Sequence, residues 1–182
     1  MIIEEEKALG ASILFFPEGK AVQAGGVCGR GAIPDPNDPG YVDFIRVETW
    51  EATRKDVKYE AVKDGSTGKL KLADEVETDG YTEYKFVTNV VLGFVIGLFF
   101  RSGAALTGNS LQFNPDQGIA PRGWLIVENR DQGGNLILAA NIWGRLKFDG
   151  TIKGGGGVLV KPELVFAQYE NNLNTMALGV AP

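Results

Sequence analysis

The sequence predicts a mainly β protein with one helix, a long charged hairpin and two terminal arms. Its 182 residues include 25 glycines, which cluster in short runs between segments rich in β-branched and aromatic residues. Glycine clusters interrupt strands and form turns, whereas β-branched and aromatic side chains favour strands. Several segments also alternate apolar and polar residues with the period of a strand. We therefore expect one β domain over residues 41–169.

Residues 1–40 are expected to form an N-terminal arm or edge strand followed by a linker. An apolar patch, Ile13 to Phe16, ends at Pro17. Residues 25–40 combine glycine, aspartate and asparagine with three prolines. Proline cannot donate to a ladder of backbone hydrogen bonds, so this stretch is predicted to be loop.

Residues 41–53 predict a strand that has on one side Val42, Phe44, Arg46, Glu48 and Trp50. Residues 54–79 are dense in charges of both signs and contain a turn at Asp64 to Gly68. They hold too few apolar residues to build a core, so we expect a protruding hairpin. Residues 81–88 alternate again and predict another strand.

Residues 89–101 predict the helix. Asn89 is a suitable N-cap, Val90 to Phe100 is apolar on every side, and Gly103 follows as a stop signal. Eleven residues reach about 16 Å, roughly half a bilayer core, so we expect no membrane span. A helix that is apolar all round must be covered on all sides, and we expect a second subunit to cover part of it. The residues expected to pack there are Val91, Phe94, Val95, Leu98 and Phe99.

The last third predicts strands over residues 123–129, 135–147 and 158–169. A turn with Gly133 and Gly134 joins the first two, and Trp124, Trp143 and Phe148 supply large apolar area. Residues 170–182 show no strong period and are expected to form a C-terminal arm.

Composition excludes several kinds of chemistry. There are 18 lysines and arginines against 23 aspartates and glutamates, a net charge of −5, no histidine and a single cysteine, Cys28. Triads of the Ser-His-Asp and Cys-His types and histidine-bound zinc are therefore ruled out, and tight binding to nucleic acid is not expected. We expect no enzyme activity, no cofactor and no metal, and a cytosolic place of synthesis, since the first residues are acidic.

Three motifs have ordinary explanations that are preferred. The segment Gly65 to Lys69 lacks the spacing of a phosphate-binding loop, and Asp35 to Gly40 is better explained as a turn than as a calcium site. Glu128 and Asp131 near one turn are most simply solvated carboxylates, although a glycosidase pair depends on folding and stays open. An all-apolar helix, a protruding hairpin and two arms together indicate a protein that assembles with copies of itself.

Residues 41–150 resemble the major tail tube proteins of tailed bacteriophages. The features that carry the resemblance are the strand entering the charged loop at Glu48 to Asp56, the turn at Asp64 to Gly68, the apolar run Val90 to Phe100, the segment Trp124 to Asn129, and the segment Ile142 to Gly150. The secreted tube of the type VI system has a related fold.

The resemblance implies a β-sandwich or barrel with one flanking helix, six copies to a ring, and rings stacked into a hollow tube that conducts DNA. The implied location is the virion tail, assembled in the bacterial host cytoplasm. The implied partners are the chain itself, the tape measure, tail tip or baseplate and tail terminator proteins, and double-stranded DNA that passes without specific binding. Residues 54–79 would bridge subunits and rings, through Lys55, Asp56, Lys58, Tyr59, Glu60, Asp64, Lys69 and Lys71.

An acidic lumen suits such a conduit, because a basic wall would gain counterion-release free energy at every phosphate and hold the DNA. The carboxylates expected to face the lumen are Glu48, Glu51, Glu83 and Glu128. Two alternatives stay open. One is another virion protein, a tail terminator or a capsid decoration protein. The other is a carbohydrate-binding β-sandwich or glycosidase domain with Trp50, Trp124 and Trp143 as an exposed platform.

Overall fold

The structure is a computed structural model that describes residues 11–44, 47–64, 71–88, 120–131, 133–148 and 163–179. Within these residues all regular elements are strands, so the predicted mainly β class is confirmed. The predicted helix over residues 89–101, with its five packing residues Val91, Phe94, Val95, Leu98 and Phe99, lies outside the described part. The strands are β1 Ala11–Pro17, β2 Val42–Asp43, β3 Val47–Asp64, β4 Lys71–Thr88, β5 Arg122–Arg130, β6 Leu136–Phe148, β7 Glu163–Gln168 and β8 Thr175–Leu178.

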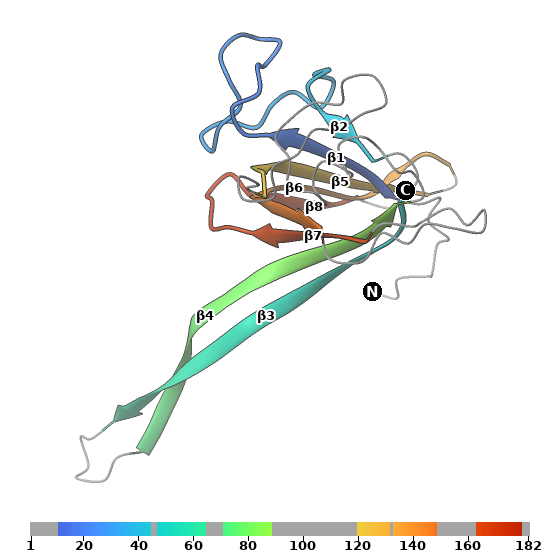
Figure 1. The fold of residues 1–182 in the computed structure, drawn as a ribbon. Coiled ribbons are helices and arrows are strands. Elements are labelled where there is room, and N and C mark those ends of the chain that lie inside the picture. The colour runs from blue at the N-terminus through green and yellow to red at the C-terminus, as the bar shows by residue number, and fades with distance from the viewer. Residues whose placement is uncertain are drawn as a thin grey trace, which may run out of the picture.

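The strands form one antiparallel sheet that closes on itself (Figure 1). Its order is β2-β1-β3-β4-β7-β6-β5, and β1 also pairs with β5 along its whole length, from Ala11↔Asn129 to Pro17↔Gly123. β8 lies along the first part of β6. Closure removes most unpaired strand edges, which are otherwise sites of uncontrolled association.

β1 is an interior strand and not the edge strand that we expected from the sequence. It pairs with β5 on one side and with β2 and the start of β3 on the other. Ile13 and Phe15 point into the closed sheet and are buried, and Phe16 is buried on the opposite face. A strand buried on both faces shows a continuous apolar run instead of an alternation, which explains the patch that ends at Pro17.

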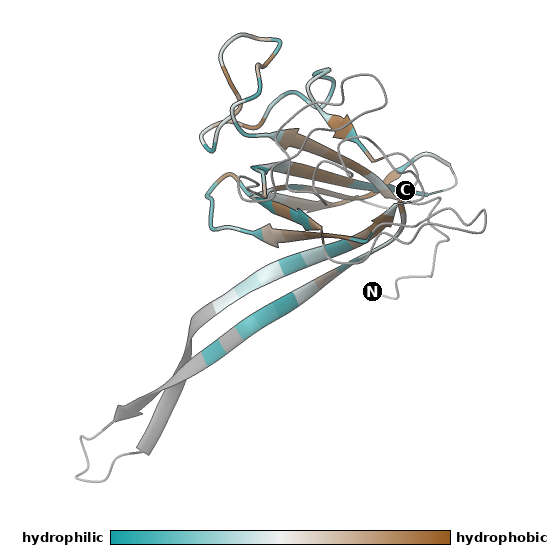
Figure 2. Cartoon of the chain, viewed as in Figure 1, coloured by the Kyte–Doolittle hydropathy of each residue, from teal (hydrophilic) through white to brown (hydrophobic). Residues whose placement is uncertain are grey.

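The inner face of the sheet holds the main core. The strands that contribute to it are largely brown, that is hydrophobic, in Figure 2. Phe44 and Phe86 meet edge to face with ring centroids 5.1 Å apart, and Phe15 and Phe166 do the same at 6.2 Å. The alternation predicted for residues 81–88 is confirmed, because Tyr84 and Phe86 are buried while their neighbours are partly exposed.

A smaller apolar cluster covers the outer face of β1, β5 and β6. Trp124 and Trp143 lie there beside Phe16 and Cys28, under the chain between β1 and β2. That chain is fastened to the sheet, since the Trp124 Nε1–H donates to the Gly29 carbonyl oxygen at 2.9 Å. The stretch expected to be a linker is therefore a packed cover.

Two facing glycines allow the sheet to curve tightly. Gly123 of β5 and Gly144 of β6 are cross-strand partners. A Cβ atom on Gly123 would lie 2.1 Å from the Phe16 carbonyl oxygen, and one on Gly144 would lie 2.1 Å from the Ala167 carbonyl oxygen. No side chain fits at those distances, so both positions require glycine.

A bulge near the start of β3 overturns part of the predicted alternation. The pair Val47↔Thr88 is followed by Thr49↔Val87, which leaves Glu48 without a facing residue. As a result Val47 and Trp50, one odd and one even position, both pack against the main core. A bulge shifts the face of every following residue, and no simple period in the sequence reveals it.

Candidate assembly interface

The long hairpin of β3 and β4 continues far beyond the closed sheet (Figure 1). β4 pairs with β7 only from Glu83↔Ala167 to Val87↔Glu163. Further out, β3 and β4 pair only with each other among the described strands, from Arg54↔Thr82 to Asp64↔Lys71. We call this outer part of the hairpin, residues 54–64 and 71–82, the arm. At about 3.3 Å per residue the arm extends roughly 30 Å.

An isolated two-stranded hairpin is at best marginally stable in water, because it has no sheet or helix against which to bury a face. The described outer residues of β3 are polar, and Figure 2 shows this part of the arm in teal. Among the described residues, no strand or helix covers a face of the arm beyond its own two strands. A surface of this shape and composition is suited to contact with another molecule.

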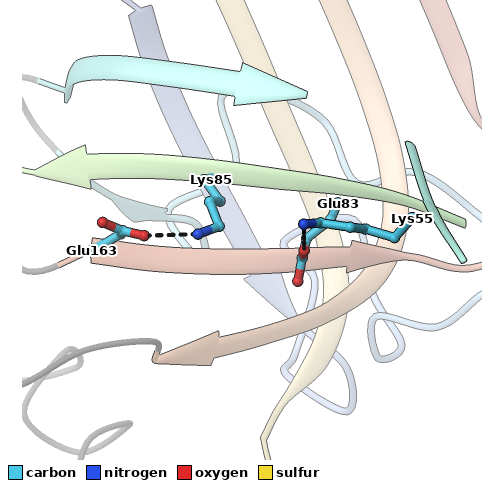
Figure 3. A network of polar contacts seen from close by, with 4 residues as sticks. All are labelled: Lys55, Glu83, Lys85 and Glu163. Carbon is cyan, nitrogen blue, oxygen red and sulfur yellow. Dashed lines mark hydrogen bonds and ion pairs between the residues drawn. The ribbon is translucent and has the colours of Figure 1, made fainter. Parts of the chain in front are cut away.

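The outer face of β3, β4 and β7, at the base of the arm, carries charges of both signs. The Lys55 Nζ lies 3.8 Å from the Glu83 Oε2, and the Lys85 Nζ lies 3.1 Å from the Glu163 Oε1 (Figure 3). Glu51 is the direct cross-strand partner of Lys85. We call these five residues the charged face. Each carboxylate in it has a lysine on a neighbouring strand, so positive and negative charges alternate.

A depression of about 340 Å³ opens on the charged face and is lined by Thr49, Trp50, Glu51, Lys85, Phe86, Val87 and Glu163. Its charged groups are two carboxylates and one ammonium group. Such a set recognises a polar partner by ion pairs and hydrogen bonds. Among the described residues, no group of three or more side chains could hold a metal ion.

The carboxylates expected to face a lumen do not all come together. Glu51 and Glu83 share the charged face, whereas Glu128 lies on β5 and makes an ion pair of 3.1 Å with Arg130. Glu48 is the unmatched residue of the bulge, and its side chain lies outside the description. Because lysines interleave with Glu51 and Glu83, the described face is mixed in charge and not uniformly acidic.

Sequence reasoning missed the participation of Lys85 and Glu163 in this face. The alternation of residues 81–88 already placed Glu83 and Lys85 on one side of a strand, so the signal for Lys85 was present. Glu163 is 78 residues away from Lys85 in the chain, and only the pairing of β4 with β7 brings it near.

The residues expected to bridge subunits lie mostly along the arm. Lys55, Asp56 and Lys58 stand at its base with partly or fully exposed side chains, and Tyr59, Glu60, Asp64 and Lys71 follow in its two strands. Lys69 lies outside the described residues. The described members of this set thus lie on one projecting element.

The three tryptophans proposed as a carbohydrate platform do not form one, because two of them are buried and Trp50 is only partly exposed. Trp124 is fully buried and Trp143 is 3% exposed. Trp50 packs against the main core, stacks on Tyr84 with centroids 6.5 Å apart, and donates from its Nε1–H to the Asn129 Oδ1 at 3.2 Å. A sugar-binding platform needs an exposed aromatic face, so the explanation from these three residues is wrong.

The carboxylate considered for glycoside hydrolysis has a structural task. Asp131 accepts hydrogen bonds from the Asn135 side chain at 2.8 Å and from the Asn135 backbone N–H at 2.7 Å, closing the turn between β5 and β6. These hydrogen bonds lower the pKa of Asp131 below its usual value. A general acid needs a raised pKa, so Asp131 does not suit that role.

Cys28 is buried in the outer cluster, and its thiol points to the Phe16 carbonyl oxygen at 3.8 Å. Burial, with smaller contributions from Glu18 and Asp38, raises the pKa of the thiol to about 11. A reactive cysteine needs a lowered pKa and access to solvent. Cys28 is therefore a packing residue.

No protein-family model and no curated protein matches the chain. Among solved structures, the chain is similar to a component of the six-fold symmetrised cryo-EM structure of the anti-feeding prophage (AFP) baseplate. The two share 10% sequence identity at a TM-score of 0.44, and the match covers 97% of each chain. A TM-score below 0.5 carries no argument about function. Among the described residues, no helix has the length and apolar character needed to cross a membrane.

Proposed function

We propose that the chain is a structural subunit of a tail tube in a bacteriophage or phage-like particle. Copies form rings of six, the rings stack into a hollow conduit for DNA, and the tape measure, baseplate and tail terminator proteins bind its ends. The observation that carries the proposal is the arm, which projects from a closed β domain and has no partner strand among the described residues. The sequence resemblance of residues 41–150 to tail tube proteins supports the same assignment.

In this proposal the arm reaches a neighbouring subunit, which provides the buried surface that the hairpin lacks by itself. The contact is heterologous, because the arm of one copy meets a different surface of the next. Heterologous contacts generate closed rings when the rotation closes and filaments when it does not. A stacked tube uses both kinds of repetition.

The charged face is the candidate for the lumen wall. Its two lysines lie beside carboxylates, so a passing phosphate finds few free cations and releases few counterions. DNA then stays hydrated and slides. Of the four carboxylates predicted to face the lumen, Glu51 and Glu83 belong to the charged face. A lumen position for Glu48 and Glu128 stays a prediction.

An arm deletion tests the proposal. Residues 59–78 are replaced by Asn-Gly, which joins the facing pair Lys58↔Asp79 by a two-residue turn. We expect the closed domain to fold, with the buried emission of Trp124 and Trp143 retained, because neither apolar cluster contains a residue of the deleted segment. Negative-stain electron microscopy should show tubes for the parent chain and none for the deletion.

A matched control keeps the arm and replaces only residues 65–70 by a glycine-serine loop of equal length. Tubes formed by the arm deletion would refute the bridging role. A parent chain that stays monomeric at high concentration would refute the tube itself, and a parent chain that stops at single rings would favour the tail terminator alternative.

A further inference from the structure

Two irregularities in strand pairing lie at the base of the arm. The last regular pair on the domain side is Lys55↔Tyr81, and the next pair is Lys58↔Asp79. Between them, Asp56 and Val57 of β3 face Gly80 alone. Two residues opposite one make a β-bulge, which bends the strand and increases its local twist.

The second irregularity has its extra residue on the other strand, β4. The pair Lys58↔Asp79 is followed at once by Tyr59↔Glu77, which leaves Thr78 of β4 without a facing residue. One extra residue on β3 and one on β4 cancel each other. The outer pairs from Tyr59↔Glu77 to Val62↔Asp74 therefore keep the same register as the pairs from Trp50↔Phe86 to Lys55↔Tyr81.

Restored register matters because a slip of one residue would turn every later side chain to the other face. With both bulges present, the outer residues keep matched cross-strand partners while the direction of the arm changes. Figure 1 shows β4 bending part-way along the hairpin. Paired bulges that change the direction of a hairpin and keep its pairing have the geometry of a joint.

Backbone conformation marks the same place. Asp56 has φ of 50° and is the one non-glycine residue with positive φ in the described part of the chain. Gly80, directly across, has φ of 136°. Aspartate tolerates the left-handed region better than most residues, and glycine adopts both regions freely.

The domain side of this place is anchored. Lys55, next to the bulge, makes the ion pair with Glu83, and the Arg54 Nη1–H donates to the Thr82 Oγ1 at 3.5 Å. From Glu83 inward, β4 is also paired with β7. The change of direction is thus confined to the few residues between Lys55 and Tyr59.

We propose that the paired bulges form a fixed joint that sets the direction in which the arm leaves the closed sheet, with Asp56 and Gly80 as its positioning residues. The consequence for assembly rests on the proposed function, whereas the joint itself does not. A second copy receives the arm only when the joint points it correctly.

The decisive variant lacks both Asp56 and Thr78, which removes the two bulges and keeps the register. Its control lacks the two neighbouring facing pairs Ala61↔Glu75 and Val62↔Asp74, which keeps both bulges and leaves the labelled residue 64 on its own face. Spin labels on Asp64→Cys and Lys147→Cys report the distance from the arm to the domain. The distance is measured by double electron–electron resonance on labelled protein diluted with unlabelled chain. Cys28 is buried and does not label.

We expect the control to shift the label distance by about 7 Å, the rise of two residues. The bulge deletion removes no facing pair, and we expect it to shift the distance by a different amount, since the arm takes a new direction. An unchanged distance in the bulge deletion would overturn the joint. Tubes should survive in the control and be lost in the bulge deletion. Equal distance shifts in the two variants would overturn the joint.

Point variants keep the test valid if the bulge deletion does not fold. Asp56→Asn should leave the distance unchanged, and Asp56→Val should shift or broaden it, because a β-branched residue disfavours positive φ. An Asp56→Val distribution identical to that of the parent would overturn the joint. A parent chain that forms no tubes would refute the proposed function, and the distance measurement would still decide on the joint.

Discussion

Replacing Gly144 by alanine tests how tightly the sheet is closed. The added Cβ would lie 2.1 Å from the Ala167 carbonyl oxygen and 2.6 Å from the Phe166 Cε1. That carbonyl belongs to β7, whose pairing with β6 includes Arg145↔Ala167, so it cannot move without disturbing the ladder. Overpacking of a close-packed interior costs about 1–3 kcal/mol, and contact with backbone puts this case near about 3 kcal/mol.

The assay is urea unfolding followed by the fluorescence of the buried Trp124 and Trp143. With a slope of about 2 kcal/mol/M, the expected loss lowers the midpoint by about 1.5 M at unchanged slope. Gly31→Ala is the matched control, because a Cβ at Gly31 meets nothing within 4 Å. Equal midpoints for Gly144→Ala and Gly31→Ala would show that the close approach of β6 and β7 is not real.

Two further outcomes follow from the same structure, and a third rests on the proposed tube. Disulfide exchange with Cys28 at pH 8 should be slow in the folded protein and complete on unfolding. The free energy of unfolding should fall as pH rises from 9.0 to about 11, because the unfolded state loses the thiol proton first. Part of that fall should vanish in Cys28→Ala. Glu163→Gln breaks the exposed ion pair with Lys85 and should lower the free energy of unfolding by less than about 1 kcal/mol in low salt. At 1 M salt the variant should not differ from the parent. A large salt-independent loss would contradict the exposed geometry. Glu51→Lys tubes should retain double-stranded DNA with a steeper salt dependence than Glu51→Gln tubes, and unchanged retention and ejection rates would count against a lumen position.

Local patterns predicted the strand class and several strands well. The predicted strands over residues 81–88 and 123–129 fall in β4 and β5, and the one over residues 135–147 overlaps β6 in all but its first residue, because each alternates or runs apolar over the length of a strand. The predicted strand over residues 158–169 contains β7. These elements depend on side chains close together in the chain, which a sequence pattern records directly.

Other features of the fold could not be read locally. The bulge at Glu48 changes which residues of β3 face the core, and bulges depend on the pairing of two strands. Residues 25–40 look like a linker because of their glycines and prolines, yet Cys28 and Ile33 in them pack against the cluster of Trp124 and Trp143. Whether a proline-rich stretch packs or projects depends on the surface available to it.

Sequence alone determined that this protein is built mainly of β-strands, and it marked residues 54–79 as too polar to form a core. Tertiary structure decided that β1 closes the sheet, that the tryptophans are internal, and that Lys85 meets Glu163 across 78 residues of chain. The physical reason is that strand pairing is a long-range choice. Each strand can pair in many registers, and only burial of one shared inner face selects among them.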